Sequence, residues 1–345
     1  MRKKNLFVMA ASVMMIFTSC SGFIDAVLGV EDKPVSENNA TPAPQPSTEE
    51  ASATEDVVEA VIDATYINAA LVISYQQTLE AFRLKKIDSE VFGASTINAD
   101  NTTLYEAWSW SYMAIRRVNF IIDYLKNGDF DYAVDAYLAE AIALRSFLYY
   151  QLAMLWGDVP LVTEDGQEPV NFPATKKEDI LTFAYNQLSG VTDLFSTSND
   201  ASHFNRMSAQ TLLAEILLTL NKKDDAKTLL SGIKDQAGDD VFHVHYISDV
   251  LEIIPASFTS LLNSTSDFCI YNKTYIDFLY KEASGDTEGL ADTWYSSTHL
   301  YGIWAAMKRL GVAQDKAGCE EYELVMPIPS SELLTNTLIT QNPGY

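Results

Sequence analysis

The chain has 345 residues, with 23 Lys or Arg against 47 Asp or Glu, so its formal net charge is −24. This acidic balance argues against a nucleic-acid partner, because binding phosphates requires clustered Lys and Arg. Hydrophobic residues make up 48% and charged residues 20% of the chain, which is typical of a globular protein with a substantial core. Three cysteines are too few for a disulfide scaffold or a multi-cysteine zinc module.

The N-terminal residues have the pattern of a bacterial lipoprotein signal. Residues 2–4 are basic, residues 6–17 form an apolar stretch of signal-peptide length, and residues 17–20 read as a lipobox. We therefore expect residues 1–19 to be a signal peptide and Cys20 to carry the lipids that anchor the protein to a membrane. An ordinary secretory signal with an incidental cysteine is the alternative. The apolar stretch is too short to cross a membrane as a helix.

A tract rich in Pro, Ser, Thr, Ala and Glu follows the lipobox, over residues 33–56. It has no apolar face, so we expect an extended, flexible tether. Residues 20–56 are therefore interpreted as a lipidated N-terminus and a tether. Its reach of roughly 25–30 Å would hold a folded body just off a membrane surface.

Residues 57–237 have helical periodicity and are expected to form tetratricopeptide-like helical pairs. Within residues 131–156, apolar side chains follow two adjacent stripes, so that helix is expected to pack on both sides. The turn at residues 221–226 is typical of a tetratricopeptide hairpin. The expected helices are residues 57–86, 103–126, 131–156, 177–194, 207–220 and 224–233. The predicted fold class is mostly α.

The pattern changes in residues 238–345, which are expected to form a small, irregular C-terminal subdomain. Residues 241–246 alternate like a short strand, and residues 268–271 look like another. Residues 284–300 are polar, contain glycine and are expected to be irregular. The Pro- and Asn-rich tail, residues 326–345, is expected to pack as ordered coil.

Four motifs occur in order behind the lipobox. They are a W-x3-Y-x2-I-x3-N helix, an E-A-x-x-L-R helix running into G-D-V-P-L, an R-M-S-A helix, and a closing P-I-P-x-x-E segment with Q-N-P-G-Y, at residues 108–119, 140–161, 206–214 and 326–345. Together they resemble the SusD/RagB family of outer-membrane nutrient-uptake lipoproteins, and the chain looks like a short member of it.

The resemblance implies a non-catalytic glycan-binding lipoprotein, lipid-anchored in the outer membrane and exposed at the cell surface. Such a protein captures oligosaccharide and delivers it to a partner, a SusC-like TonB-dependent transporter. No cofactor is expected, and the chain contains no H-E-x-x-H, G-x-S-x-G, Walker or Rossmann pattern. The alternative is a peptide-binding lipoprotein, or an interaction protein of a surface complex whose helical pairs bind a protein partner without contacting sugar.

The candidate glycan-binding residues combine a stacking surface with hydrogen-bonding groups. Sugars present apolar C–H faces that stack on aromatic rings, while polar side chains bind their hydroxyls. Trp108 and Trp110 lie two residues apart on a helix, so one of them is expected near the surface. The alternative is that the aromatics of the C-terminal subdomain only fill its core. The candidates are Trp294, Tyr295, His299, Tyr301, Asn101 and Trp108.

Two groups of residues could in principle hold a metal ion. His243 and His245 share one face of a predicted strand, but ordinary strand histidines are the alternative. Asp286, Glu288 and Asp292 could bind Ca²⁺ or form a solvated acidic loop. We predict no metal site.

Arg145 and the two remaining cysteines are interpreted as structural. Arg145 lies near the apolar face of its helix and is expected to pair with Glu140 or with a turn carbonyl near Asp158. Cys269 and Cys319 either form a bridge or remain as two buried thiols. A bridge would close a loop of about 50 residues and contribute about 4 kcal/mol on the chain-entropy model.

Overall fold

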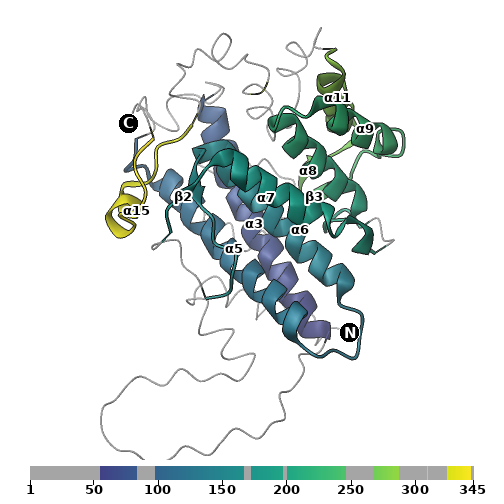
Figure 1. The fold of residues 1–345 in the computed structure, drawn as a ribbon, viewed down its shortest axis with the longest axis horizontal. Helices are drawn as coiled ribbons and strands as arrows, with labels where there is room; N and C mark the ends of the chain where they lie inside the picture. The colour runs from purple at the N-terminus through teal and green to yellow at the C-terminus, as the bar shows by residue number, and fades with distance from the viewer. Residues whose placement is uncertain are drawn as a thin grey trace, which may run out of the picture.

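The computed structural model describes residues 55–83, 98–166, 172–196, 200–245, 267–286, 309 and 325–342. Over these residues the protein is mostly α, as predicted (Figure 1). The helices are α3 (Glu55–Arg83), α5 (Thr102–Asn127), α6 (Asp135–Trp156), α7 (Lys177–Ser189), the 3₁₀ turn η2 (Thr192–Leu194), α8 (Arg206–Thr219), α9 (Lys223–Ile233), α11 (Lys273–Ser284) and α15 (Ser330–Thr335). The strands are β1 (Val159–Pro160), β2 (Ala174–Thr175), β3 (Phe242–His245) and β4 (Asp267–Tyr271).

Successive helices pack as neighbours, in the manner of stacked helical pairs. Helix α3 packs on α5, α5 on α6, α6 on α7, α7 on α8, α8 on α9, and α9 on α11 (Figure 1). The predicted helix over residues 177–194 is interrupted after Ser189, where Gly190 ends α7 and the chain continues as η2. The predicted helix over residues 131–156 begins at Asp135.

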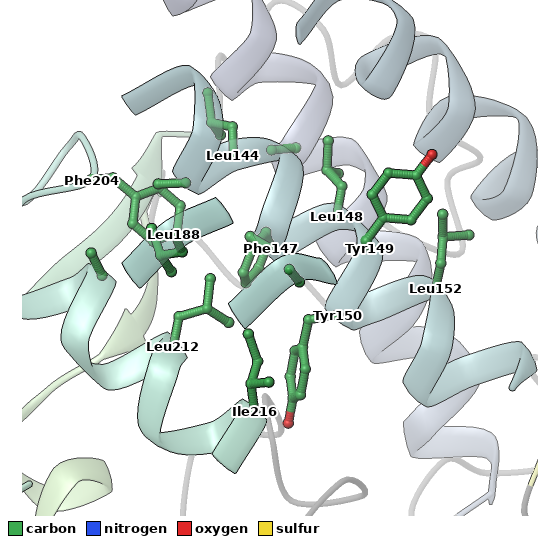
Figure 2. Packing of buried hydrophobic residues seen from close by; sticks show 14 of the residues in the cluster. Leu144, Phe147, Leu148, Tyr149, Tyr150, Leu152, Leu188, Phe204, Leu212 and Ile216 are labelled. Atoms are coloured by element: carbon green, nitrogen blue, oxygen red, sulfur yellow. The ribbon is translucent and has the colours of Figure 1, made fainter. Parts of the chain in front are cut away.

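Helix α6 is the centre of the core. Every residue from Ala141 to Trp156 on it is buried, because α3, α5, α7 and α8 surround it. Figure 2 shows residues of α6 meeting Leu188 of α7, Phe204, and the α8 residues Leu212 and Ile216. The two apolar stripes read from the sequence therefore correspond to two packed faces.

The α8–α9 turn has the tight form expected of a helical hairpin. Asn221 adopts φ +58°, in the left-handed region that Asn tolerates better than most residues. This conformation lets the Lys222 N–H donate to the Leu217 carbonyl at 2.8 Å. The turn thus satisfies a carbonyl at the end of α8 and sends α9 back along it.

The described part of the C-terminal subdomain contains a strand pair and a helix. Strands β3 and β4 form an antiparallel pair, as predicted, with an irregularity in register between Phe242 and His243. The described residues also contain α11, a 12-residue helix that is not among those expected from the sequence, capped by Asn272, whose side chain accepts from the Tyr275 N–H. Gly285, at φ +74°, ends this helix in the left-handed conformation that glycine adopts without strain.

The closing segment packs against the end of α6. Trp156 donates its indole N–H to the Pro327 carbonyl at 3.0 Å, and the Met326 N–H donates to the Leu155 carbonyl at 2.7 Å. Asn342 donates to the carbonyls of Trp156 and Met326 at 2.9 and 2.6 Å. The tail is thus ordered by hydrogen bonds to a buried helix end, with α15 as its one helix among the described tail residues.

Two observations concern the membrane-related predictions. None of its helices combines the length and the apolar character that crossing a bilayer requires. Cys20 and the signal peptide lie outside the described residues, as does nearly all of the predicted tether, residues 33–56. The last two residues of that tract already belong to α3, which begins at Glu55.

Candidate functional site

The turn before α5 contains the one described residue of the predicted glycan-binding set that reaches the surface. Asn98 accepts from the Asp100 N–H at 3.0 Å, and the Asn101 N–H donates to the Asn98 carbonyl at 3.1 Å. The Asn101 side-chain oxygen accepts from the Leu104 N–H at 3.0 Å and so caps α5. Because the oxygen is used in this way, Asn101 can offer a sugar its amide N–H group.

Trp108 does not present its ring to a ligand in the described structure. It is 1% exposed and packs edge-on against Trp156, with ring centroids 5.2 Å apart and planes at 89°. Trp110 is the less buried of the two tryptophans, on the side of α5 away from this contact. The expectation that Trp108 contacts glycan is therefore replaced by a core-packing role, since a stacking residue needs an accessible face.

The remaining candidates, Trp294, Tyr295, His299 and Tyr301, lie outside the described residues. The chain is described up to Asp286, just after α11, and again at Arg309. Their role in glycan binding stays a prediction from the sequence.

The side chain of Arg309 joins α11 to α6. Its guanidinium donates to both carboxylate oxygens of Glu282, at 2.8 and 2.9 Å, and to the Tyr150 hydroxyl at 3.1 Å. Glu282 is 2% exposed, so this is a buried, bidentate ion pair. Removing either partner would leave the other as an uncompensated buried charge, which is strongly destabilising. The contact between Arg309 and α11 therefore needs both side chains.

A second buried carboxylate lies nearby, on α8. Glu215 is completely buried and accepts hydrogen bonds from the hydroxyls of Tyr271 and Tyr275, at 2.6 and 2.5 Å. Burial raises the pKa of Glu215, while the charge of Arg309 and the two tyrosine hydroxyls act to lower it. Sequence reasoning missed this group, although a lone Glu within the apolar run Leu212–Leu218 indicates a buried, partnered carboxylate.

Arg145 has the structural role expected of it, but with other partners than Glu140. Its guanidinium donates to the Asn119 side-chain oxygen at 3.0 Å, to the Thr163 carbonyl at 3.1 Å and to the Gln187 side-chain oxygen at 2.9 Å. Burial lowers the pKa of Arg145 to about 10, against the opposing effect of Tyr149. Asn119 belongs to the first sequence motif and Arg145 to the second, so these two motifs meet in the core.

No metal centre is found among the residues that the structure describes, where no three His, Cys, Asp or Glu side chains are grouped as ligands. His243 is paired with Asp240, at 2.7 Å from Nδ1 to the carboxylate. Glu288, Asp292 and the side chain of His245 lie outside the described residues.

Cys269 is a free thiol in the structure, and burial raises its pKa to about 11. Of the two alternatives for the cysteines, the structure therefore has Cys269 unbridged, while Cys319 lies outside the described residues. A thiol with so high a pKa is mostly protonated at neutral pH, so it is a poor nucleophile.

Comparison with known proteins gives matches in sequence and in fold. A family model described as SusD-like, starch-binding and associating with the outer membrane matches residues 45–218. SusD-like protein P38 from Formosa agariphila is 25% identical over 142 residues, which are 40% of this chain and 28% of that protein. A SusD-like protein from Bacteroides ovatus is 27% identical over 163 residues, 45% of this chain and 29% of that one. The chain thus matches less than a third of the length of either curated relative.

Solved structures match over most of the chain. A laminarin-binding SusD-like protein superposes with a TM-score of 0.64 at 15% identity, covering 84% of this chain and 99% of its own. Surface glycan-binding protein A from Bacteroides fluxus gives the same TM-score at 12% identity, covering 85% and 100%. At this level of identity the likeness establishes the fold.

Proposed function

Since the chain belongs to the SusD-like family, whose model covers half of it, we propose that it is a surface-exposed glycan-binding lipoprotein. In this proposal it captures oligosaccharide and delivers it to a partner TonB-dependent outer-membrane transporter, without catalysing a reaction. The observation that carries the proposal is the family match to proteins described as starch-binding and outer-membrane-associated. The fold shared with a laminarin-binding SusD-like protein supports it.

The positions of the family motifs indicate where a ligand would not bind. Asn119 and Arg145 are buried and hydrogen-bonded to each other, Trp156 is buried under Pro327, and Asn342 is used to hold the tail. These side chains build the scaffold, so their polar groups are not available to a sugar. We therefore look for the ligand surface among residues outside the motifs.

We assign that surface to the aromatic residues Trp294, Tyr295 and Tyr301 with His299, assisted by Asn101. Aromatic rings beside hydrogen-bonding groups offer both a stacking face and partners for hydroxyls. Asn101 supports the assignment because it lies in a surface turn with its amide N–H group uncommitted to a described residue. The other four contribute by residue type and by their place in a polar segment of the sequence.

The test is a glycan array followed by titration calorimetry with the oligosaccharide it identifies, the array including laminarin and starch oligosaccharides. Trp294→Ala is expected to cost about 1–3 kcal/mol of binding free energy if one ring stacks on one sugar, by analogy with aromatic–base stacking. Tyr185→Ala, an aromatic substitution on α7, is the matched control and should leave the affinity unchanged. Unchanged affinity in both Trp294→Ala and Tyr301→Ala, with the fold intact by circular dichroism, would place the site elsewhere. An array without any glycan hit would contradict glycan binding itself.

Delivery to a transporter and lipid anchoring at Cys20 complete the proposal. The anchor rests on the order of basic region, apolar stretch and lipobox in the first 20 residues. Co-purification from detergent-solubilised outer membranes is the direct test of the transporter partnership. A protein recovered alone under conditions that preserve other membrane complexes would contradict it.

A further inference from the structure

Helices α3 and α6 and the loop before α8 meet along a line of acidic and hydroxyl groups, here called the α3–α6 seam. Helix α3 runs beside α6, and its N-terminal end is the first described part of the chain (Figure 1). Carboxylates or hydroxyls from all three elements face one another there, with one histidine among them. The seam consists of Glu55, Glu59, Asp63 and Tyr66 of α3, Tyr137 and Glu140 of α6, and Asp200, Ser202 and His203 of the loop.

His203 joins the loop to α3. Its Nε2 lies 3.0 Å from a carboxylate oxygen of Asp63, and its Nδ1 lies 3.2 Å from the Ser202 hydroxyl and 4.0 Å from Asp200. The ring also packs edge-on against Tyr66, with centroids 4.7 Å apart. A protonated His203 can therefore donate to α3 while facing two carboxylates.

Tyr66 joins the same loop to α6. Its hydroxyl accepts from the Phe204 N–H at 2.7 Å and donates to a carboxylate oxygen of Glu140 at 3.3 Å. Tyr66 is 6% exposed, so the hydrogen bond is shielded from water. Glu140 thus lies where three elements meet, and the basic group that faces it is His203.

At the start of α3 the carboxylates continue along the seam. The Tyr137 hydroxyl lies 2.9 Å from Glu55 and 2.9 Å from Glu59, so two acidic side chains share one donor. Asp63 follows one turn later on the same helix face. The seam therefore places like charges side by side, and ionising another carboxylate within it is unfavourable.

Two titratable groups in the seam, Glu140 and His203, have raised pKa values. Burial raises the pKa of Glu140 to about 7, opposed by the charge of His203 and the Tyr66 hydroxyl and reinforced by the charges of Asp63 and Asp200. Burial lowers the pKa of His203, but the hydrogen bond to Asp63 and the charges of Glu140, Asp63 and Asp200 outweigh this and leave it raised. The neighbouring His243 of β3 is paired with Asp240, at 2.7 Å, and is the other histidine that faces Asp200.

The charge of the seam follows from these groups. With Asp63 and Asp200 ionised, His203 protonated and Glu140 neutral, these four groups carry a net charge of −1. Once both His203 and Glu140 have lost their protons, the same four groups carry −3. The acid form is therefore the one in which α3, α6 and the loop attract one another.

We propose that the α3–α6 seam is a pH-sensitive joint, closed in mildly acidic conditions and loosened as the pH rises through neutrality. Both groups bind protons more tightly when the joint is closed, so its stability is greatest below their unfolded-state pKa values and falls as the pH passes the raised ones. The element released is the N-terminal part of α3, which directly follows residues 1–54. The joint thus sets how firmly the body holds the helix through which it continues to the N-terminal segment.

Hydrogen exchange measured by mass spectrometry on the full chain tests the joint. After correction for the intrinsic exchange rate, peptides covering residues 55–66 should open about tenfold more at pH 8 than at pH 6 from Glu140 alone. One released proton changes the equilibrium about tenfold per pH unit, and this dependence levels off above the raised pKa of about 7. Peptides from α9 should show no such change. Glu140→Gln, which stays neutral, should remove most of the pH dependence, and Glu178→Gln, an exposed substitution on α7, should retain it.

Three results would overturn the proposal. These are equal corrected exchange of residues 55–66 at the two pH values, an undiminished pH dependence in Glu140→Gln, and a pH change of the same size in α9. Titration of His203 by nuclear magnetic resonance is the second measurement and needs no variant. A pKa of His203 at or below that of an exposed histidine would also refute the joint.

Discussion

Replacing Trp156 by phenylalanine is expected to destabilise the protein and to release its tail. The indole is completely buried, packs edge-on against Trp108, and donates its N–H to the Pro327 carbonyl at 3.0 Å. Phenylalanine keeps an aromatic ring at the position but has no donor and a smaller volume. The substitution therefore tests whether the tail is held by the hydrogen bonds seen at the end of α6.

The expected loss follows from two contributions. An unpaired, buried Pro327 carbonyl costs about 1–3 kcal/mol. The space left by the smaller ring costs about 1–2 kcal/mol, in line with other large-to-small core substitutions. Trp156→Phe should therefore lower the free energy of unfolding by roughly 2–5 kcal/mol, measured by urea denaturation.

A matched control and a second substitution in the tail show whether the loss of stability comes from the contact between Trp156 and the tail. Trp110→Phe, at a partly buried position of α5, should cost less than about 1 kcal/mol. Asn342→Ala removes the donor to the Trp156 and Met326 carbonyls, so its cost should not add to that of Trp156→Phe. The reasoning fails if Trp156→Phe costs no more than Trp110→Phe, or if Trp156→Phe and Asn342→Ala are strictly additive.

Two further predictions concern the anchor and the core. Cys20→Ala should move the protein from the membrane fraction to the soluble fraction on immunoblots, because the lipidated residue is lost; equal membrane retention would contradict the lipobox. Arg145→Met should cost about 1–3 kcal/mol in urea denaturation, since it leaves the buried Asn119 oxygen and the part-buried acceptors on Thr163 and Gln187 without their donor. Arg145→Lys should fall between Met and wild type, and a Lys variant as stable as wild type would show that the fork of donors is not needed.

The sequence by itself determined the helical part of the fold closely. Helices α5, α8 and α9 begin and end within one residue of the predicted bounds, because periodicity, capping residues and turn residues are local signals. The burial of α6 on two faces was likewise visible in its two apolar stripes. Helix α11 could have been predicted on the same grounds, since Asn272 and Gly285 flank an apolar pattern at Ile276, Leu279 and Ala283.

Only the tertiary structure decided which side chains meet. Glu140 was an expected partner of Arg145 from its position on the same helix, yet the two point to different neighbours: Arg145 reaches Asn119 and Gln187, and Glu140 reaches Tyr66. The spacing of Trp108 and Trp110 showed that their directions differ, but not which of them faces the core. That depended on Trp156, which is 48 residues away along the chain from Trp108 and touches it in the fold.

The α3–α6 seam and the buried carboxylate of Glu215 likewise depend on contacts between residues far apart in the sequence. A sequence shows that Glu140, His203 and Asp63 are ionisable, but their pKa values depend on burial and on charges brought together from α3, α6 and a loop. Glu215 likewise lies in an apolar run and meets Tyr271 and Tyr275 only after β4 and α11 have packed on α8. Local patterns specify helices because their hydrogen bonds are local, whereas the electrostatic environment of a side chain is a property of long-range contacts and is set only by the packed fold.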